Sequence, residues 1–328
     1  MSSPTPLQIG VELTSRCDLR CRHCLRDADE PAVDFDLDLF EMVASQAARL
    51  GPFHFALTGG EPTLHPRFSD FLRVLANHRL TAHVVTNGVR FPEIREQLLE
   101  LQGTLTGVSV SLDGADASTH DELRGPGSFA RAMMAIGLAV RDGWPVTVQC
   151  VVCRANRRQL AEVTALCGEM GVSLLLFAGV IPTARPRAND LALDRDELKG
   201  VAAEVVELAR VADLRVGVST GHFDPAPIAH CETLRHLGYN VDARGRLTFC
   251  CQLSGVAGSD DDVIADLRRV PLAEALRAHV RIASDVTAER LRRVAEHPDD
   301  PWLGFHCQHC YARFGKRGFE RDPDDEEG

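Results

Sequence analysis

The sequence lacks several features that would place it in a common class of protein. Its longest stretch without a charged residue, 170–184, has 15 residues, fewer than the roughly 17–25 that a membrane-spanning helix needs. The first ten residues contain neither a basic segment nor an apolar run, so no secretory signal is visible. Acidic residues outnumber basic ones by 47 to 36, and a net charge of −11 argues against nucleic acid as the main partner. P-loop, H-E-x-x-H and G-x-S-x-G motifs are absent too.

What the chain does contain is eleven cysteines. Because no export signal is visible, we expect a cytoplasmic protein in a reducing compartment, where disulfides are rare. An odd number also leaves at least one cysteine without a partner. The expected use of these cysteines is therefore metal binding or catalysis.

Short runs rich in β-branched residues alternate with amphipathic stretches over the first 180 residues. This order predicts a parallel sheet covered by helices, because parallel strands need crossover connections. The expected strands are 8–13, 53–57, 82–86, 107–112, 146–152 and 172–178, and the expected helices are 37–50, 68–77, 93–101, 129–142 and 158–170.

The pattern changes near residue 220. Before that point we expect a loop over 179–190, a helix over 195–211 and one more strand over 214–219. After it, the sequence predicts a hairpin and two helices, and then an acidic tail that is expected to be disordered. These elements are the hairpin strands 239–243 and 247–250, the helices 272–282 and 287–296, and the tail 319–328.

Three cysteines, Cys17, Cys21 and Cys24, directly follow the first expected strand with the spacing C-x3-C-x2-C. Thiolates are soft ligands that suit zinc or iron–sulfur clusters. A structural zinc site needs four ligands, whereas three cysteines leave one iron of a [4Fe–4S] cluster free to hold a small molecule. The alternative is a chance grouping of three buried cysteines. The position favours the cluster, because active sites form at the carboxyl ends of barrel strands.

Together with motifs after the next strands, the triplet resembles the radical S-adenosylmethionine (SAM) superfamily. Gly59–Pro62 (GGEP) ends the second expected strand, and VVTNG and VSVSLDG end the third and fourth. The resemblance covers roughly residues 8–180. It implies a [4Fe–4S] cluster whose open iron is chelated by the amino and carboxylate groups of SAM. It also implies that SAM is cleaved reductively to a 5′-deoxyadenosyl radical, which abstracts a hydrogen atom from the substrate.

The resemblance further implies which residues contact SAM. In the GGEP motif, glycines allow close backbone approach and the carboxylate can accept a hydrogen bond from the SAM amino group. His23 stands where the family usually has an aromatic residue beside the adenine. Contacts to the ribose or carboxylate are carried over for three more residues, each of which could instead be a turn residue or a surface charge. The full set is His23, Gly59, Gly60, Glu61, Pro62, Asn87, Ser111 and Arg124.

A second group of cysteines, Cys231, Cys250, Cys307 and Cys310, resembles the ligands of the twitch domain, the shortened form of the SPASM domain. Gly245 precedes Cys250 at the expected hairpin turn, where a positive φ is favoured. No cysteine follows Cys310, so the pattern supports at most one auxiliary [4Fe–4S] cluster. Four thiolates would close that cluster and make it an electron relay. A zinc site with four cysteine ligands is the alternative.

Four cysteines remain. Cys150 and Cys153 lie three positions apart on an expected strand and so point to opposite faces, which disfavours a chelating pair. Cys167 is expected in the core. Cys251 directly follows an expected ligand, and in some peptide epimerases of this class a cysteine near the auxiliary site returns a hydrogen atom to the substrate radical. Cys251 is therefore a hypothetical hydrogen-atom donor, with packing or ligation in place of Cys250 as alternatives.

These observations predict an α/β fold: an incomplete (β/α)6 TIM-like barrel with a small C-terminal α+β iron–sulfur cluster-binding module. The expected domains are residues 1–220 for the radical SAM barrel, 221–318 for the twitch-type module and 319–328 for the tail. The resemblance implies a radical SAM enzyme, an oxidoreductase or isomerase, with two [4Fe–4S] clusters and SAM as cofactors.

Enzymes with this layout modify ribosomally synthesised peptides, by epimerisation, cross-linking or oxidation, or oxidise small hydroxylated molecules such as aminocyclitols. The adjacent Cys250 and Cys251 favour a peptide. Only seven residues precede the first expected strand, so a separate peptide-recognition protein is a candidate partner. An external reductant such as a flavodoxin or ferredoxin is also implied, and neither nucleic acid nor a membrane is expected. The remaining alternative is a non-enzymatic electron carrier or scaffold.

Overall fold

A computed structural model describes residues 7–26, 31–219, 221, 223–224, 231–300 and 302–319. One sheet of ten strands runs through these residues in the order β10-β9-β8-β1-β2-β3-β4-β5-β6-β7. The strands are β1 (Leu7–Thr14), β2 (Phe53–Gly59), β3 (Thr81–Thr86), β4 (Leu105–Ser111), β5 (Val146–Val152), β6 (Leu174–Gly179), β7 (Arg215–Val218), β8 (Gly238–Val241), β9 (Arg246–Thr248) and β10 (Val263–Asp266).

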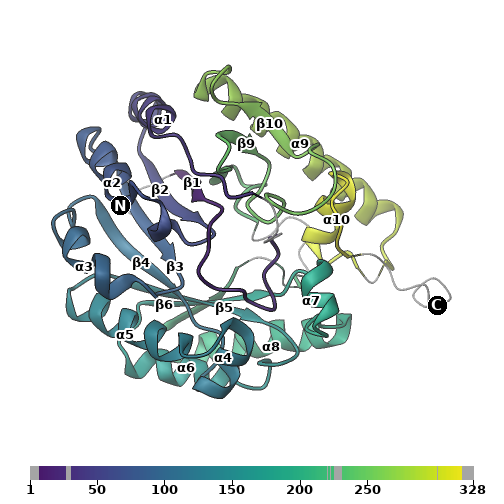
Figure 1. Ribbon diagram of the computed structural model, residues 1–328. Helices are drawn as coiled ribbons and strands as arrows, with labels where there is room; N and C mark the ends of the chain where they lie inside the picture. The colour runs from purple at the N-terminus through teal and green to yellow at the C-terminus, as the bar shows by residue number, and fades with distance from the viewer. Residues whose placement is uncertain are drawn as a thin grey trace.

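Strands β1 to β7 pair in parallel, each with the next, and helices connect most of them. β7 and β10 are the two edges of the sheet, so it forms an open barrel (Figure 1). The helices are α1 (Leu37–Leu50), the 3-10 turn η1 (Pro62–Leu64), α2 (Phe68–Asn77), α3 (Phe91–Leu99), α4 (Ala117–Arg124), α5 (Ser128–Arg141), α6 (Leu160–Glu169), α7 (Ala184–Ala188), α8 (Arg195–Val211), α9 (Leu272–Glu296) and α10 (His306–Arg313).

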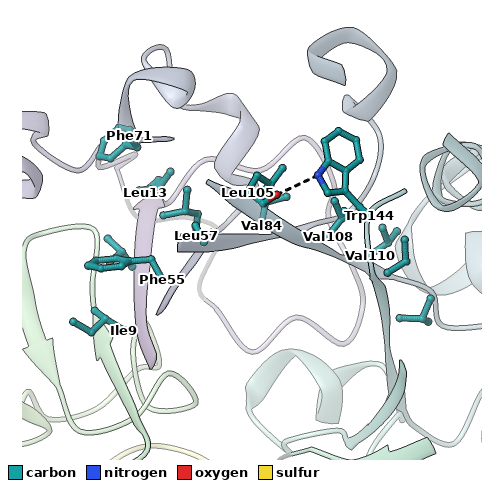
Figure 2. Close-up of a cluster of buried hydrophobic side chains, with 14 of the residues drawn as sticks. Ile9, Leu13, Phe55, Leu57, Phe71, Val84, Leu105, Val108, Val110 and Trp144 are labelled. Carbon is teal, nitrogen blue, oxygen red and sulfur yellow. Dashed lines mark hydrogen bonds between the residues drawn. The ribbon is translucent and has the colours of Figure 1, made fainter. Parts of the chain in front are cut away.

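The main core lies between the outer face of the sheet and the helices that cover it. Alternate strand residues such as Phe55 and Leu57 are fully buried there, against Phe40 and Phe71 from α1 and α2. Figure 2 shows this layer, in which Trp144 Nε1 donates a hydrogen bond of 3.2 Å to Leu105 O. Because outward residues fill the core, the alternate residues of each strand face the inside of the barrel.

The C-terminal residues extend the same sheet. β8 pairs in parallel with β1, and β9 and β10 follow in antiparallel order. A second apolar cluster lies here, centred on Phe249, Tyr311 and Phe314. The predicted turn between the hairpin strands is confirmed, with Gly245 at φ +79°.

The structure confirms the expected parallel α/β arrangement and most element positions. One prediction is wrong: the two helices expected at 272–282 and 287–296 are the single helix α9. Its apolar face continues through the buried residues Ala283 and Val286. The polar Ser284 and Thr287 are accommodated because their hydroxyls donate to carbonyl oxygens one turn earlier.

The segment expected as a loop over 179–190 contains the short helix α7. The sequence did not predict α4, α10 or β10. α4 and α10 have few apolar residues, so they lack a helical pattern; α4 begins where the Asp116 side chain accepts from Thr119 N.

The division into domains at residue 220 stays a prediction. Nearly all of the acidic tail lies outside the described residues. Among the helices that are described, none is both long and apolar enough to cross a membrane.

Candidate active site and auxiliary cysteine site

The cysteine triplet lies in the loop that leaves β1. Cys21 is buried, Cys17 and Cys24 are half-buried, and all three are free thiols. Cys24 N donates to Cys21 O at 3.2 Å, which closes a turn in the loop. Burial raises the pKa of Cys17 to about 11 and also raises that of Cys21. Ionisation of these thiols therefore needs a nearby positive centre, which a metal cluster supplies, so their chemistry fits cluster ligands.

The Gly59–Gly60 pair packs the end of β2 against this loop. Gly60 N donates to Thr14 O and Glu61 N donates to Arg16 O, both at 2.7 Å. A Cβ atom on Gly60 would lie 2.2 Å from Arg16 O, and one on Gly59, whose φ is +138°, would lie 2.3 Å from Thr14 O. The close approach that requires glycine is therefore to the chain's own loop. It places the GGEP segment beside the triplet.

Glu61 turns its carboxylate into the protein. Oε1 accepts hydrogen bonds from the hydroxyls of Thr63 and Thr86 at 2.7 and 2.9 Å, and Oε2 accepts from Asn87 N at 2.8 Å. Burial raises the pKa of Glu61 in spite of these bonds. The carboxylate thus joins the ends of β2 and β3, next to the buried Pro62 that begins η1. Its contact with SAM stays a prediction.

Asn87 and Ser111 lie at the ends of β3 and β4 and differ in how their side chains are used. Asn87 Nδ2 donates to Asp18 Oδ1 in the triplet loop at 2.7 Å, and its Oδ1 accepts from Val89 N at 2.9 Å. Ser111 is half-buried, and its hydroxyl has no hydrogen-bond partner within the described part of the chain. Ser111 therefore keeps a free polar group at the mouth of the barrel, whereas Asn87 fixes the loop.

A buried polar network lies behind Cys21. Arg124 Nε donates to Asp113 Oδ2, while Nη1 lies 4.0 Å from Cys21 Sγ. His23 Nε2 lies 3.2 Å from the same Asp113 oxygen. Burial lowers the pKa of His23 to about 4, so the ring is neutral near pH 7. Arg124 and His23 thus both contact Asp113, and Arg124 also lies beside the Cys21 thiol of the triplet.

Asp113 is a site residue that the sequence reasoning missed, although the motif VSVSLDG contains it. Its side chain is fully buried, and Oδ1 also accepts from Val151 N at 2.8 Å. Burial raises the pKa of Asp113, but Arg124 and His23 outweigh this effect and hold it below the usual value. An acidic residue directly after a buried strand was the signal available, because such a charge needs a buried partner.

The four cysteines of the second group come together from three segments. Cys231 precedes a turn, Cys250 follows β9, and Cys307 and Cys310 lie one turn apart on α10. All four are half-buried against the second apolar cluster. Burial raises the pKa of Cys307 to about 12 and also raises that of Cys231 and Cys310, and neighbouring thiols add to this effect. Four soft donors in an apolar enclosure fit a metal centre that takes thiolates.

Within the described ranges, no three His, Cys, Asp or Glu side chains converge closely enough to ligate a single metal ion. A [4Fe–4S] cluster does not require its ligands to converge on one metal ion, because each thiolate binds a different iron. The ligand roles of both cysteine groups stay predictions.

Cys251 lies between the two groups and is exposed. Interaction with the adjacent Cys250 thiol lowers the pKa of Cys251, and the same interaction, together with burial, raises the pKa of Cys250. Arg26, whose Nη1 is 2.6 Å from Glu12 Oε2, lies near the thiols of both Cys24 and Cys251. Cys251 is thus on the side of the C-terminal residues that faces the triplet loop.

A cavity of about 290 Å³ opens beside Cys17, between the triplet loop and the turn from β8 to β9. Its lining is rich in arginine. Two of these cations are paired with lining carboxylates, Arg26 with Glu12 at 2.6 Å and Arg246 with Asp242 at 2.7 Å. The five lining arginines are Arg16, Arg20, Arg26, Arg244 and Arg246.

The structure confirms the expectations for three other cysteines. Cys150 and Cys153 are buried in two different apolar clusters, so they do not form a pair. Cys167 is buried in the main core.

Comparison with known proteins decides the family. Residues 11–167 match the family model of the Radical SAM superfamily. Residues 11–167 form a domain of this superfamily. Membership implies a [4Fe–4S] cluster and SAM, for which the triplet supplies suitable ligands. It also confirms the family resemblance seen in the triplet and GGEP motifs.

Two curated relatives illustrate the range of activities in the superfamily. The chain is 31% identical over 189 residues to the AdoMet-dependent heme synthase of Methanosarcina barkeri, covering 56% of this chain and 54% of the relative. It is 34% identical over 253 residues to the mycofactocin maturase MftC of Mycobacterium ulcerans, covering 74% and 64%. The chain therefore spans less than two thirds of the length of either relative.

Among solved structures, native anSMEcpe with bound AdoMet and the Kp18Cys peptide has a TM-score of 0.71 at 17% identity. The match covers 95% of this chain and 91% of that one. This likeness concerns the fold, and it confirms the predicted incomplete TIM-like barrel.

Proposed function

We propose that this chain is a radical SAM enzyme that cleaves SAM reductively at the Cys17–Cys21–Cys24 loop and abstracts a hydrogen atom from a peptide. The observation that carries the proposal is the docking of Gly60 and Glu61 onto that loop through two backbone hydrogen bonds of 2.7 Å. The docking joins the cluster-ligand motif and the SAM motif at the carboxyl ends of β1 and β2, where barrel enzymes place their chemistry. When bound, the cluster and SAM supply the electron transfer and the radical.

The chain's own residues position these groups. Cys17, Cys21 and Cys24 would hold three irons of the cluster. Ser111, with its free hydroxyl, is the side chain best placed to bind the SAM ribose or carboxylate. Glu61, Asn87 and Arg124 already have protein partners, so their main contribution is to fix the loops around SAM.

The quartet of Cys231, Cys250, Cys307 and Cys310 would hold a second [4Fe–4S] cluster, closed by four thiolates. Such a cluster would act as a one-electron relay. Metal analysis of a variant with all three triplet cysteines changed to Ala tests this. After anaerobic reconstitution we expect about four irons per chain and a visible charge-transfer spectrum. Zinc without iron would establish the four-cysteine zinc site instead.

A peptide substrate is supported by the maturase relative, since relatives of this kind modify ribosomal peptides. The heme synthase relative favours a non-peptide substrate, and a small hydroxylated molecule is the second candidate. The arginine-lined cavity beside Cys17 is the proposed opening through which substrate reaches SAM. Assays of SAM cleavage with peptides encoded by neighbouring genes, and with aminocyclitols in parallel, discriminate between the two. Stimulation by the peptide alone is the expected result.

Cys251 is the proposed hydrogen-atom donor to the substrate radical; the thiyl radical left on its sulfur would take up one proton from solvent and one electron, relayed from the external reductant through the auxiliary cluster. Its exposed thiol is adjacent to Cys250 and close to Arg26, on the side that faces the triplet. In deuterated water, the wild-type enzyme should introduce one deuterium into the peptide product. Cys251→Ala should lose this product while still cleaving SAM, and the core variant Cys167→Ala should retain it. Unchanged product from Cys251→Ala would refute the role.

Two partners complete the proposal. An external reductant such as a flavodoxin or ferredoxin would supply electrons, and a separate protein would present the peptide. Pull-down with the peptide and with each candidate partner, followed by the SAM cleavage assay, tests both.

A further inference from the structure

Arg290 is a buried charge on α9 whose two terminal nitrogens have no hydrogen-bond partner. Only 5% of the residue is exposed, and neither Nη1 nor Nη2 forms a hydrogen bond within the described part of the chain. Ala283 and Val286, seven and four positions earlier, are fully buried in the second apolar cluster. Residues at this spacing share one helix face, so α9 turns the guanidinium into the protein.

Two neighbouring charged residues of α9, Glu289 and Arg293, do have partners. Arg293 Nη2 is 2.5 Å from Asp300 Oδ2, and Glu289 is 3.1 Å from Arg313 Nε. Both of these pairs are at least partly exposed. The buried position therefore holds the cation without a carboxylate bonded to it, whereas Arg293 and Glu289 at the more exposed positions are paired.

The groups whose charge acts most strongly on Arg290 are predicted ligands of the auxiliary cluster. Burial lowers the pKa of Arg290, and the thiols of Cys310, Cys231 and Cys307, followed by Asp224, act in the opposite direction. A guanidinium stays protonated even so. A buried charge without a bonded counter-charge is costly, and negative charge on the cysteines, added to that of Asp224, would offset this cost.

A bound water does not account for the arrangement. A cavity of about 20 Å³ lies beside Arg290, lined also by His306 and His309, and this is room for about one water. A water can accept a hydrogen bond but cannot neutralise a positive charge. The compensation must come from anionic groups. Besides Asp224, the thiols are the candidates, since Cys307 and Cys310 lie on α10 next to His306 and His309, which line the cavity together with Arg290.

We infer that Arg290 is the counter-charge of the auxiliary cluster, donating N–H bonds to the sulfur atoms of the cluster held by Cys231, Cys250, Cys307 and Cys310. The inference rests on the proposed auxiliary cluster. Hydrogen bonds to sulfur and local positive charge raise the reduction potential of an iron–sulfur cluster. Arg290 is thus a positioning residue that makes the auxiliary cluster easier to reduce and ties α9 to α10.

The test uses the full chain with Cys17, Cys21 and Cys24 changed to Ala, so that any cluster signal comes from the quartet. Arg290→Met is introduced into this background. Arg292→Met, an exposed arginine on the same helix, is the matched control. Arg290→Lys keeps the charge and loses the planar fork. Thermal unfolding is measured with and without reconstituted iron, and the cluster's midpoint potential is measured by spectroscopic titration.

Without iron, Arg290→Met should raise the Tm by about 2–4 °C or more, because it removes a buried uncompensated charge. With iron bound, the same variant should gain less Tm from cluster loading and have a more negative midpoint potential than its parent. Arg290→Lys should recover most of the potential, and Arg292→Met should change neither quantity.

Three outcomes are decisive. Iron-dependent effects with the signs given above support the inference. Iron that binds with an unchanged potential in Arg290→Met, together with a lower Tm of the iron-free variant, makes Arg290 a packing residue and overturns the inference. Absence of iron from the parent background refutes the auxiliary cluster itself. That result would overturn the proposed function, and it is distinguishable from a failure of the role inferred for Arg290.

Discussion

Replacing Asp113 by Asn tests the buried network behind the triplet. The side chain is fully buried, and its carboxylate is the counter-charge of Arg124, of which only 9% is exposed. An amide of the same shape still accepts from Val151 N through Oδ1, but its NH2 group replaces Oδ2, so the substitution removes both the charge and the acceptor of the Arg124 hydrogen bond. Breaking a buried ion pair at one partner costs about 3–5 kcal/mol, because the other charge is left uncompensated.

The assay is urea unfolding of the iron-free protein under reducing conditions, followed by circular dichroism. Asp70→Asn is the matched control, because Asp70 also contacts two arginines, Arg67 and Arg73, but at the surface. The control should lose no more than about 1 kcal/mol. Asp113→Asn combined with Arg124→Met should be less destabilised than Asp113→Asn alone. A loss of under about 1 kcal/mol for Asp113→Asn, equal to that of the control, would refute the reasoning.

Two further predictions concern the triplet loop and the barrel interior. Gly60→Ala places a Cβ atom 2.2 Å from Arg16 O and should at least halve the iron bound at the triplet. Gly103→Ala is the control, because its Cβ atom would have nothing within 4 Å, and it should keep the iron. Equal iron in the two variants would contradict a structural role for the close approach at Gly60. Burial lowers the pKa of His83 to about 4, and its Nδ1 lies 2.8 Å from His54 Nε2. As the pH falls, the unfolded chain takes up this proton at a higher pH than the folded chain does. The contribution of His83 to the free energy of unfolding is therefore fully present above about pH 6.5 and falls by up to about 3 kcal/mol towards pH 4. His83→Gln should flatten this slope in urea unfolding of the iron-free protein, and an unchanged slope would count against it.

Local sequence signals predicted much of the barrel because several of its elements begin and end at residues with a clear local role. The helix expected at 37–50 has those bounds in the structure, since the Asp36 side chain accepts from Leu39 N and Gly51 ends the helix. The strands were visible because their apolar residues face a core on the outer side of the barrel. The triplet stood out by its spacing, whereas GGEP and the C-terminal cysteines were identified by their resemblance to family motifs.

Pairings between distant residues could not be read in this way. The sequence does not show that Glu61 would turn towards Thr86, or that Arg124 would pair with Asp113, because these contacts depend on how strand ends meet. Nor could it show that Arg290 would be buried without a carboxylate partner. α9 was divided in two because its polar residues mask a continuous apolar face, which only tertiary packing reveals.

The central claim is reductive cleavage of SAM at the Cys17–Cys21–Cys24 loop. Its most direct test is the amount of 5′-deoxyadenosine formed when the anaerobically reconstituted, dithionite-reduced protein is incubated with SAM. We expect 5′-deoxyadenosine from the wild type and from Cys310→Ala, and none from Cys21→Ala. Absence of 5′-deoxyadenosine from a wild-type protein with a fully loaded triplet, or equal amounts from Cys21→Ala, would contradict it.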